Sequence, residues 1–119
     1  MKKILVIDDS KFVRNFHINI LQSAGFSADA AEDGIEGLEK AMTTDYDLVI
    51  SDINMRNMDG LTFTRKLRET GSTIPIMIIS TQSSDDDRMA GFEAGANVFV
   101  TKPVRPEKLI ENIKLLINQ

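Results

Sequence analysis

Short apolar runs alternate with longer segments of mixed polarity along the whole chain. The runs are "ILVI" at 4–7, a weaker "SADA" at 27–30, "DLVI" at 47–50, "IPIMII" at 74–79 and "VFV" at 98–100. Continuous apolar runs of this length are typical of strands that are covered on both faces, as the strands of a parallel sheet are. The pattern therefore predicts five buried parallel strands.

The segments between these runs show helical spacing and predict five helices. The inner faces predicted for the first two helices are Phe12, Val13, Phe16 and Ile20, and then Ile35, Leu38 and Met42. For the third and fifth helices they are Leu61, Thr64 and Leu67, and then Leu109, Ile110, Ile113, Leu116 and Ile117. Asp59 is placed to cap the third helix, Gly95 ends the fourth, and Glu36 and Lys40 are spaced for an ion pair.

Strands and helices that alternate in this way form a β-α repeat, which right-handed crossovers turn into a doubly wound parallel sheet. The chain has 119 residues, of which 42% are hydrophobic and 27% charged, the balance of one soluble globular domain. It has no linker, low-complexity tract or repeat of fixed period. We therefore predict one α/β domain over residues 1–119.

The charge balance excludes several classes of function. The net charge is −4, from 18 acidic and 14 basic residues, and no basic block is present, which argues against direct binding of nucleic acid. The absence of cysteine leaves no disulfide or thiolate zinc site. No apolar run is long enough for a membrane span or a signal peptide. We expect a cytoplasmic, monomeric protein.

Polar side chains follow four of the predicted strands. They are Asp8 and Asp9, Ser51 and Asp52, Ser80 and Thr81, and Thr101 and Lys102. Because ligands of an open parallel sheet bind beyond the carboxyl ends of its strands, these side chains are expected to converge on one site.

The adjacent carboxylates of Asp8 and Asp9 indicate what this site binds. Two like charges about 4 Å apart repel by about 4 kcal/mol at an effective dielectric constant of 20, so the pair needs a positive partner. Oxygen ligands without histidine or cysteine favour Mg²⁺ over zinc. A metal-held carboxylate beside lysine and hydroxyl groups suits phosphoryl transfer, and Asp52, after the central third strand, is the best candidate for the nucleophile.

The chain resembles a response-regulator receiver domain of the CheY-like type over its full length. The resemblance rests on "VIDDS" at 6–10, "SDINMRNMDG" at 51–60, Ser80 after "IMII", and "VTKP" at 100–103. It implies a flavodoxin-like sheet with strand order 2-1-3-4-5. It also implies that Asp52 accepts phosphate from a histidine kinase with the help of Mg²⁺.

The resemblance also implies individual roles. Asp9 binds Mg²⁺ directly, Asp8 binds it largely through water, and Asp52 and the carbonyl group of Asn54 complete its protein ligands. Lys102 and Ser80 hold the phosphoryl oxygens, and the Lys102–Pro103 peptide bond is cis. The remaining implied residues are the aromatic switch Phe99, which turns inward when Ser80 moves, and the lifetime-tuning positions Asn54 and Gln82. The output is a changed surface of helix four, strand five and helix five.

Several functions fit this resemblance. We expect a phosphoacceptor and not an enzyme, acting in chemotaxis on a target such as the flagellar motor switch. The alternatives are a phosphorelay intermediate that serves a histidine phosphotransfer protein, and a receiver domain cut from a larger regulator. A Mg²⁺-dependent aspartyl-phosphate phosphatase is disfavoured because "DD" replaces the D-x-D of that class and no cap is present. A receiver-like domain that takes no phosphate is disfavoured by the intact acidic, hydroxyl and lysine residues.

Other notable residues are interpreted as structural. Arg56 is expected to be a solvated loop cation, and "DDD" at 85–87 to complement a helix dipole. His17, the only histidine, is expected on the border of the first helix's apolar stripe. Met55, Met58, Met77 and Met89 are expected to fill the core.

Overall fold

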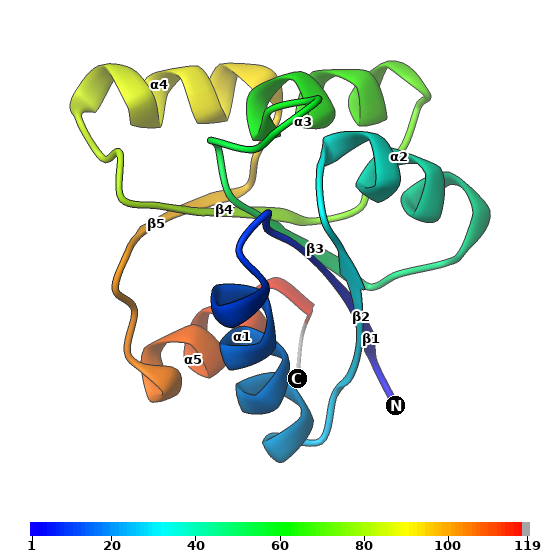
Figure 1. The fold of residues 1–119 in the computed structure, drawn as a ribbon, viewed down its shortest axis with the longest axis vertical. Helices are drawn as coiled ribbons and strands as arrows, with labels where there is room; N and C mark the ends of the chain where they lie inside the picture. The colour runs from blue at the N-terminus through cyan, green and yellow to red at the C-terminus, as the bar shows by residue number, and fades with distance from the viewer. Residues whose placement is uncertain (118–119) are drawn as a thin grey trace.

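The computed structural model describes residues 1–117 as a parallel sheet between two layers of helices (Figure 1). The strands are β1 (Lys3–Ile7), β2 (Ser27–Ala31), β3 (Leu48–Ser51), β4 (Ile76–Ser80) and β5 (Val98–Thr101). They are paired in parallel in the order β2-β1-β3-β4-β5. The predicted doubly wound fold, its strand order and all five predicted strands are confirmed.

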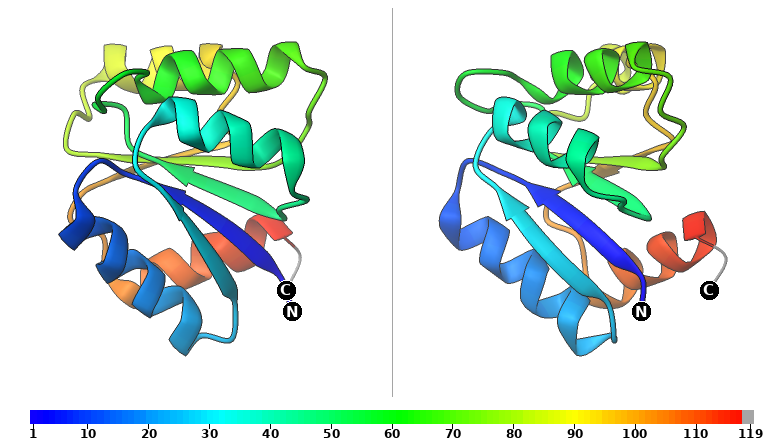
Figure 2. Two further views of the ribbon diagram at one scale, coloured as in Figure 1. Left: turned by 45° about the vertical axis from the view of Figure 1, so that its right-hand side comes forward. Right: turned by 90° about the vertical axis from the view of Figure 1, so that its right-hand side faces the viewer.

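Five helices connect or follow these strands. They are α1 (Lys11–Ser23), α2 (Gly34–Thr43), α3 (Gly60–Glu69), α4 (Asp85–Ala94) and α5 (Pro106–Ile117). Helices α1 and α5 cover one face of the sheet, and α2, α3 and α4 cover the other (Figures 1 and 2). No helix within residues 1–117 is long and apolar enough to cross a membrane.

Side-chain caps fix where four of the helices begin. The oxygens of Ser10, Asp33, Asp59 and Ser84 accept hydrogen bonds from free backbone N–H groups in the first turns of α1 to α4. The predicted cap at Asp59 is confirmed. Helix α4 carries its three aspartates in the first turn and ends at Gly95 with φ 116°, as expected.

The sheet separates the apolar core into two layers. Within β1, Leu5 and Ile7 belong to the layer beneath α2, α3 and α4, whereas Ile4 and Val6 belong to the layer beneath α1 and α5. All residues of β3 and β4 are buried. Burial on both faces explains why the sequence shows continuous apolar runs and no alternation. It also holds the carboxyl ends of the strands, where the site lies, in fixed positions.

The predicted inner face of α1 is wrong for Phe12 and Phe16, whereas Val13 and Ile20 are partly buried as predicted. Its buried residues are Arg14, His17 and Leu21, whereas Phe12 and Phe16 are 82% and 47% exposed. The guanidinium of Arg14 donates a buried hydrogen bond of 2.7 Å to the carbonyl of Asp8. Because this partner compensates the buried charge, a polar face can turn inward and leave aromatic side chains outside.

The predicted inner face of α2 is also wrong. Ile35 and Met42 are 52% and 60% exposed, and the buried residues are Gly34 and Gly37. A Cβ atom at Gly34 would lie 2.5 Å from the carbonyl oxygen of Met58, so the helix approaches its neighbours too closely for a side chain. Leu38 is partly buried as predicted.

The faces of α3 and α5 and several single residues follow the prediction more closely. Thr64, Leu67, Leu109, Ile113 and Ile117 are buried, and Leu61, Ile110 and Leu116 are partly buried. Lys40 pairs with Glu36 at 3.3 Å, and Arg56 is exposed. Met77 is buried, and Met55 and Met58 are partly buried against the core, as predicted. Met89 is 59% exposed, so its assignment to the core is wrong.

Candidate functional site

Three charged side chains meet at the carboxyl edge of the sheet. The ammonium nitrogen of Lys102, after β5, lies 3.0 Å from Asp8 Oδ2, after β1, and 2.9 Å from Asp52 Oδ2, after β3. These side chains are only 16%, 5% and 15% exposed, respectively. The structure therefore brings together residues 94 and 50 positions apart in the chain, and one cation bridges two carboxylates with little solvent around them.

The backbone fixes the position of Asp52 from two sides. Its N–H donates to the carbonyl of Ile7 at 3.2 Å, which continues the pairing of β3 with β1. Its side-chain Oδ1 accepts a 2.6 Å hydrogen bond from the N–H of Ile53. Oδ2 is left facing Lys102, so one carboxylate oxygen has a structural partner and the other faces the charged site.

Gly60, at the start of α3, packs directly on the backbone of Asp52. A Cβ atom built on Gly60 would overlap the carbonyl oxygen of Asp52 and lie 2.9 Å from its carbonyl carbon. The N–H of Gly60 also donates to the carbonyl of Ile53 at 2.7 Å. Helix α3 can approach Asp52 this closely only because position 60 carries no side chain.

We predict that Gly60→Ala destabilises the protein by about 3 kcal/mol, since the added methyl group overpacks rigid backbone. A loss of stability is informative here, because replacing glycine by alanine in an unobstructed helix increases the free energy of unfolding by about 1 kcal/mol. Urea unfolding checks the prediction, with Gly71→Ala as the control for backbone strain. Gly71 has φ 90°, and a methyl group added there would meet no other atom within 4 Å, so its cost is expected to be smaller. Equal midpoints for Gly60→Ala and the parent protein would contradict the packing argument.

Lys102 is held both by its backbone and by its charge. Its N–H donates to the carbonyl of Ser80 at 2.9 Å, and the Lys102–Pro103 bond is cis, as predicted. Burial works to lower the pKa of the Lys102 ammonium, but hydrogen bonds and charge from Asp52 and Asp8 outweigh it and raise the pKa above 10.5. The ammonium is therefore charged throughout the physiological range.

Asp8 is tied to the beginning of α1. Its Oδ1 accepts from the N–H of Ser10 at 2.9 Å, and its carbonyl accepts from Arg14. Asp8 is 4% exposed, and each of its carboxylate oxygens accepts a hydrogen bond, Oδ1 from Ser10 and Oδ2 from Lys102. Lys102 is therefore a positively charged partner, supplied by the chain itself, for the acidic pair of Asp8 and Asp9.

Further oxygen donors for a cation follow Asp8 and Asp52 in the chain. Asp9 follows Asp8 and is partly exposed, and Asn54 lies exposed two residues after Asp52. Within residues 1–117, no three acidic or histidine side chains are placed so that they could already hold a metal ion. The chemistry of the donors nevertheless fits Mg²⁺: all are oxygens, and three carboxylates against one ammonium leave two negative charges for a divalent cation to neutralise.

The predicted hydroxyl and switch residues lie on β4 and β5. Ser80 is 1% exposed, and its Oγ accepts from the N–H of Gln82 at 3.1 Å. Phe99 is only 5% exposed, so its ring already lies inward in this structure. The ring packs against Gly91, where a Cβ atom would lie 3.0 Å from Phe99 Cδ2, and the Arg88 guanidinium carbon lies 5.1 Å from the ring centroid. The switch roles of Ser80 and Phe99 remain predictions.

Sequence reasoning did not identify three residues that support the site. Arg14 and His17 fall on the inner face of α1, and Gly60 lies against Asp52. The sequence gives no indication that Arg14 is buried, because its hydrogen-bond partner is the backbone carbonyl of Asp8, which any residue at that position would provide. Gly60 had a weak signal in "MDG", where a glycine follows a capping aspartate.

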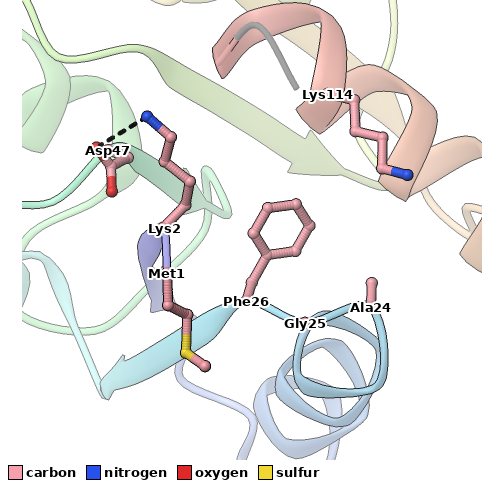
Figure 3. Close-up of a pocket in the computed structure, with 7 residues that line it drawn as sticks. All are labelled: Met1, Lys2, Ala24, Gly25, Phe26, Asp47 and Lys114. Carbon is pink, nitrogen blue, oxygen red and sulfur yellow. Dashed lines mark ion pairs between the residues drawn. The ribbon is translucent and has the colours of Figure 1, made fainter.

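A cavity of about 510 Å³ lies at the opposite edge of the sheet (Figure 3). It is bordered by Lys2, Phe26 and Asp47, which precede β1, β2 and β3, and Lys2 lies 4.0 Å from Asp47. None of the charged residues of the site reaches it. The chemistry therefore belongs to the carboxyl edge, where Asp52 and Lys102 meet.

Comparisons with known proteins agree with this geometry. The family described as response regulator receiver domain matches residues 4–114. The uncharacterized transcriptional regulatory protein YclJ of Bacillus subtilis is 39% identical over 117 residues, covering 98% of this chain and 51% of that protein. The response regulator MprA of Mycobacterium leprae is 35% identical with the same coverage. The chain therefore spans about half the length of these curated relatives.

Solved structures extend the similarity to three dimensions. The chemotaxis protein CheY4 of Vibrio cholerae superposes with a TM-score of 0.92 and 34% identity over 98% of each chain. The response regulator protein TrrA of Thermotoga maritima, in complex with Mg(2+)-BeF, gives a TM-score of 0.89 and 34% identity over 98% of this chain and 99% of that one.

Proposed function

We propose that this chain accepts a phosphoryl group on Asp52 from a histidine kinase, because it belongs to the response regulator receiver domain family. The observation that carries this proposal is the Lys102 ammonium, 2.9 Å from Asp52 Oδ2 at the carboxyl edge of the sheet. It places a permanent cation beside the one carboxylate oxygen that has no backbone partner. The chain is then a phosphoacceptor, and not an enzyme that acts on other molecules.

The chemistry follows from the atoms of the site. Oδ2 of Asp52 attacks the phosphorus of a phosphohistidine, and an oxygen–phosphorus bond forms as the nitrogen–phosphorus bond breaks. The leaving imidazole nitrogen keeps the electron pair of that bond. Lys102 stabilises the negative charge that spreads over the phosphoryl oxygens, and the hydroxyl of Ser80 becomes a donor to them if it gives up its contact with Gln82.

Asp8, Asp9, Asp52 and the carbonyl of Asn54 are the proposed holders of Mg²⁺. When bound, the ion supplies positive charge that neutralises the carboxylates and the incoming phosphoryl group. Asn54 and Gln82 are polar side chains positioned after Asp52 and Ser80, and we assign to them the tuning of phosphoryl lifetime. Their exposure to solvent fits a role in orienting an attacking water.

Intact-mass spectrometry with acetyl phosphate tests this function. The expected result is one added phosphate in the presence of Mg²⁺ and none after the metal is chelated with EDTA. Sustained hydrolysis of phosphomonoesters would instead support the phosphatase alternative. The absence of any adduct would support a receiver-like domain that takes no phosphate.

The proposed output is a change in the surface formed by α4, β5 and α5, with chemotaxis as the favoured setting. Phosphorylation adds about two negative charges and three acceptor oxygens, which Ser80 and Lys102 must accommodate. Phe99 and Arg88 connect β5 to α4 at this surface. The similarity to the chemotaxis protein CheY4 supports a target such as the flagellar motor switch. The test measures binding of the beryllofluoride form of this chain to purified motor switch protein and to a purified histidine phosphotransfer protein. Preferential binding to the first supports chemotaxis, and preferential binding to the second supports a phosphorelay.

A second candidate follows from the coverage of the relatives. YclJ and MprA are about twice as long as the matched region, and YclJ is described as a transcriptional regulatory protein. The chain would then be the receiver portion of a larger regulator. Immunoblotting of source cells with an antibody against this domain separates the two, because the chain alone has a mass of 13.3 kDa. A band of about that mass in the cytoplasmic fraction supports the stand-alone protein, and a band of twice the mass supports the larger regulator.

A further inference from the structure

His17 lies on the inner face of α1 and borders the same cavity as Lys102. The residue is only 5% exposed, although it is polar and lies on a helix that covers the sheet. It borders a cavity of about 300 Å³ between α1 and the loop after β5. The other residues around this cavity are Val13, Phe16, Thr81, Lys102, Pro103 and Val104.

The imidazole has no polar partner of its own within the described chain. Among residues 1–117, its ring nitrogens make no hydrogen bond or ion pair and are not fully sealed from solvent. The Phe16 ring lies beside the imidazole, with ring centroids 5.7 Å apart. Most of the cavity lining is apolar. A charged imidazolium in this position would lose solvation without gaining a direct counter-ion.

The charged groups that act on His17 come from three other segments. They are Lys102 after β5, Asp8 after β1 and Asp52 after β3. On α1 itself, the guanidinium of Arg14 is engaged by the carbonyl of Asp8, and the cavity residues contributed by the loop toward α5 are Pro103 and Val104, which carry no charge. Burial lowers the pKa of His17 below 6.5 and the Lys102 charge lowers it further, whereas the two carboxylates oppose the shift and do not overcome it.

We propose that the neutral imidazole of His17 is a positioning residue for Lys102, and that protonation of His17 slows phosphorylation of Asp52. This inference rests on the proposed function of Asp52. The uncharged ring forms the α1 side of the cavity along which the Lys102 side chain lies, so the ammonium is directed toward Asp8 and Asp52. A protonated ring would repel the ammonium and attract the same two carboxylates.

The first experiment compares pH profiles. Rates of phosphorylation by acetyl phosphate with Mg²⁺ are measured for the natural protein, His17→Leu and His17→Arg, and each profile is normalised to its own rate at the alkaline end. Between about pH 7.5 and 5.5, the natural protein is expected to lose about threefold more rate than His17→Leu, since leucine cannot take up a proton. His17→Arg is expected to be slow at every pH. Superimposable normalised profiles for the natural protein and His17→Leu would overturn the proposal.

The second experiment does not depend on phosphorylation. His17 is the only histidine, so its imidazole gives a single set of NMR signals that can be followed through a pH titration. Removing the nearby positive charge with Lys102→Met is expected to raise the titration midpoint of His17. An unchanged midpoint would overturn the coupling between the two side chains. If the natural protein takes no phosphate at all, the proposed function fails, while this titration still tests the pairing of His17 with Lys102.

Discussion

Asp52→Asn is expected to abolish the phosphate adduct formed with acetyl phosphate and Mg²⁺. The amide has no anionic oxygen with which to attack phosphorus, and no other carboxylate at the sheet edge has the same position against Lys102 and β3. The fold is expected to persist, because an amide oxygen can still accept the hydrogen bond from the N–H of Ile53. Intact-mass spectrometry measures the loss, and circular dichroism verifies the fold.

Asp59→Asn provides the matched control. Asp59 is seven residues further along the same loop, is exposed, and caps α3, a role that asparagine fills equally well. This variant should take up phosphate like the natural protein. An adduct of equal intensity in Asp52→Asn would assign the acceptor to another residue and contradict the proposed chemistry.

Lys102→Met is expected to slow phosphorylation of Asp52 by about 100-fold, the usual loss when one charge-stabilising donor is removed from a transition state. The same change should cost about 3 kcal/mol of stability without Mg²⁺, since it leaves two buried carboxylates facing each other without their shared cation. Stopped-flow or quenched mass measurements give the rate, and urea unfolding gives the stability.

Mg²⁺ provides an internal control for the Lys102 prediction. A divalent ion restores positive charge near the carboxylates, so it should recover part of the lost stability and none of the missing ammonium's contribution to the rate. The pH dependence has a defined sign as well. The pKa of Lys102 is raised in the folded protein, so its stabilising effect is complete below pH 10.5 and is lost as the pH rises through the folded-state pKa. Equal stability of Lys102→Met and its parent at neutral pH would contradict the role of the bridge.

The sequence was sufficient to predict the parts of the fold that depend on burial on both faces. Continuous apolar runs identified four strands and the weaker "SADA" run identified β2; the signal is clearest in the central strands β3 and β4, which bury every side chain. The strand ends then identified Asp8, Asp52 and Lys102 as neighbours, because parallel strands place their carboxyl ends at one edge. The contact geometry confirms that these three residues meet.

Helix faces were harder to predict, and the reason is physical. Apolar periodicity assumes that the most hydrophobic side chains face inward, whereas α1 buries Arg14 and His17 and exposes Phe12. The partner that makes burial of Arg14 favourable is a backbone carbonyl, which has no sequence signature. In α2, Gly34 faces inward because the helix lies very close to Met58, and Gly37 because it lies very close to the Ile7 side chain of β1.

The cis bond before Pro103 was predicted from the resemblance alone. Nothing in spacing or polarity distinguishes this proline from the other two in the chain. The internal neutralisation of Asp8 by Lys102 was not expected either, because the adjacent carboxylates alone pointed to a metal ion. The structure shows that the Lys102 side chain is already a counter-ion for Asp8 and Asp52, and the metal ion stays a prediction.

The close packing of Gly60 on Asp52 has a mechanical consequence. The backbone of Asp52 is confined between β1 on one side and the first turn of α3 on the other. A chemical change at its side chain therefore cannot be absorbed by yielding of the main chain beneath it. If Asp52 takes up phosphate as proposed, we expect the resulting displacement to appear in the segments that carry Ser80 and Lys102 and not in the backbone of Asp52. Asp52 would then be the fixed point of the site, with the moving parts of the signal on β4, β5 and the loops that follow them.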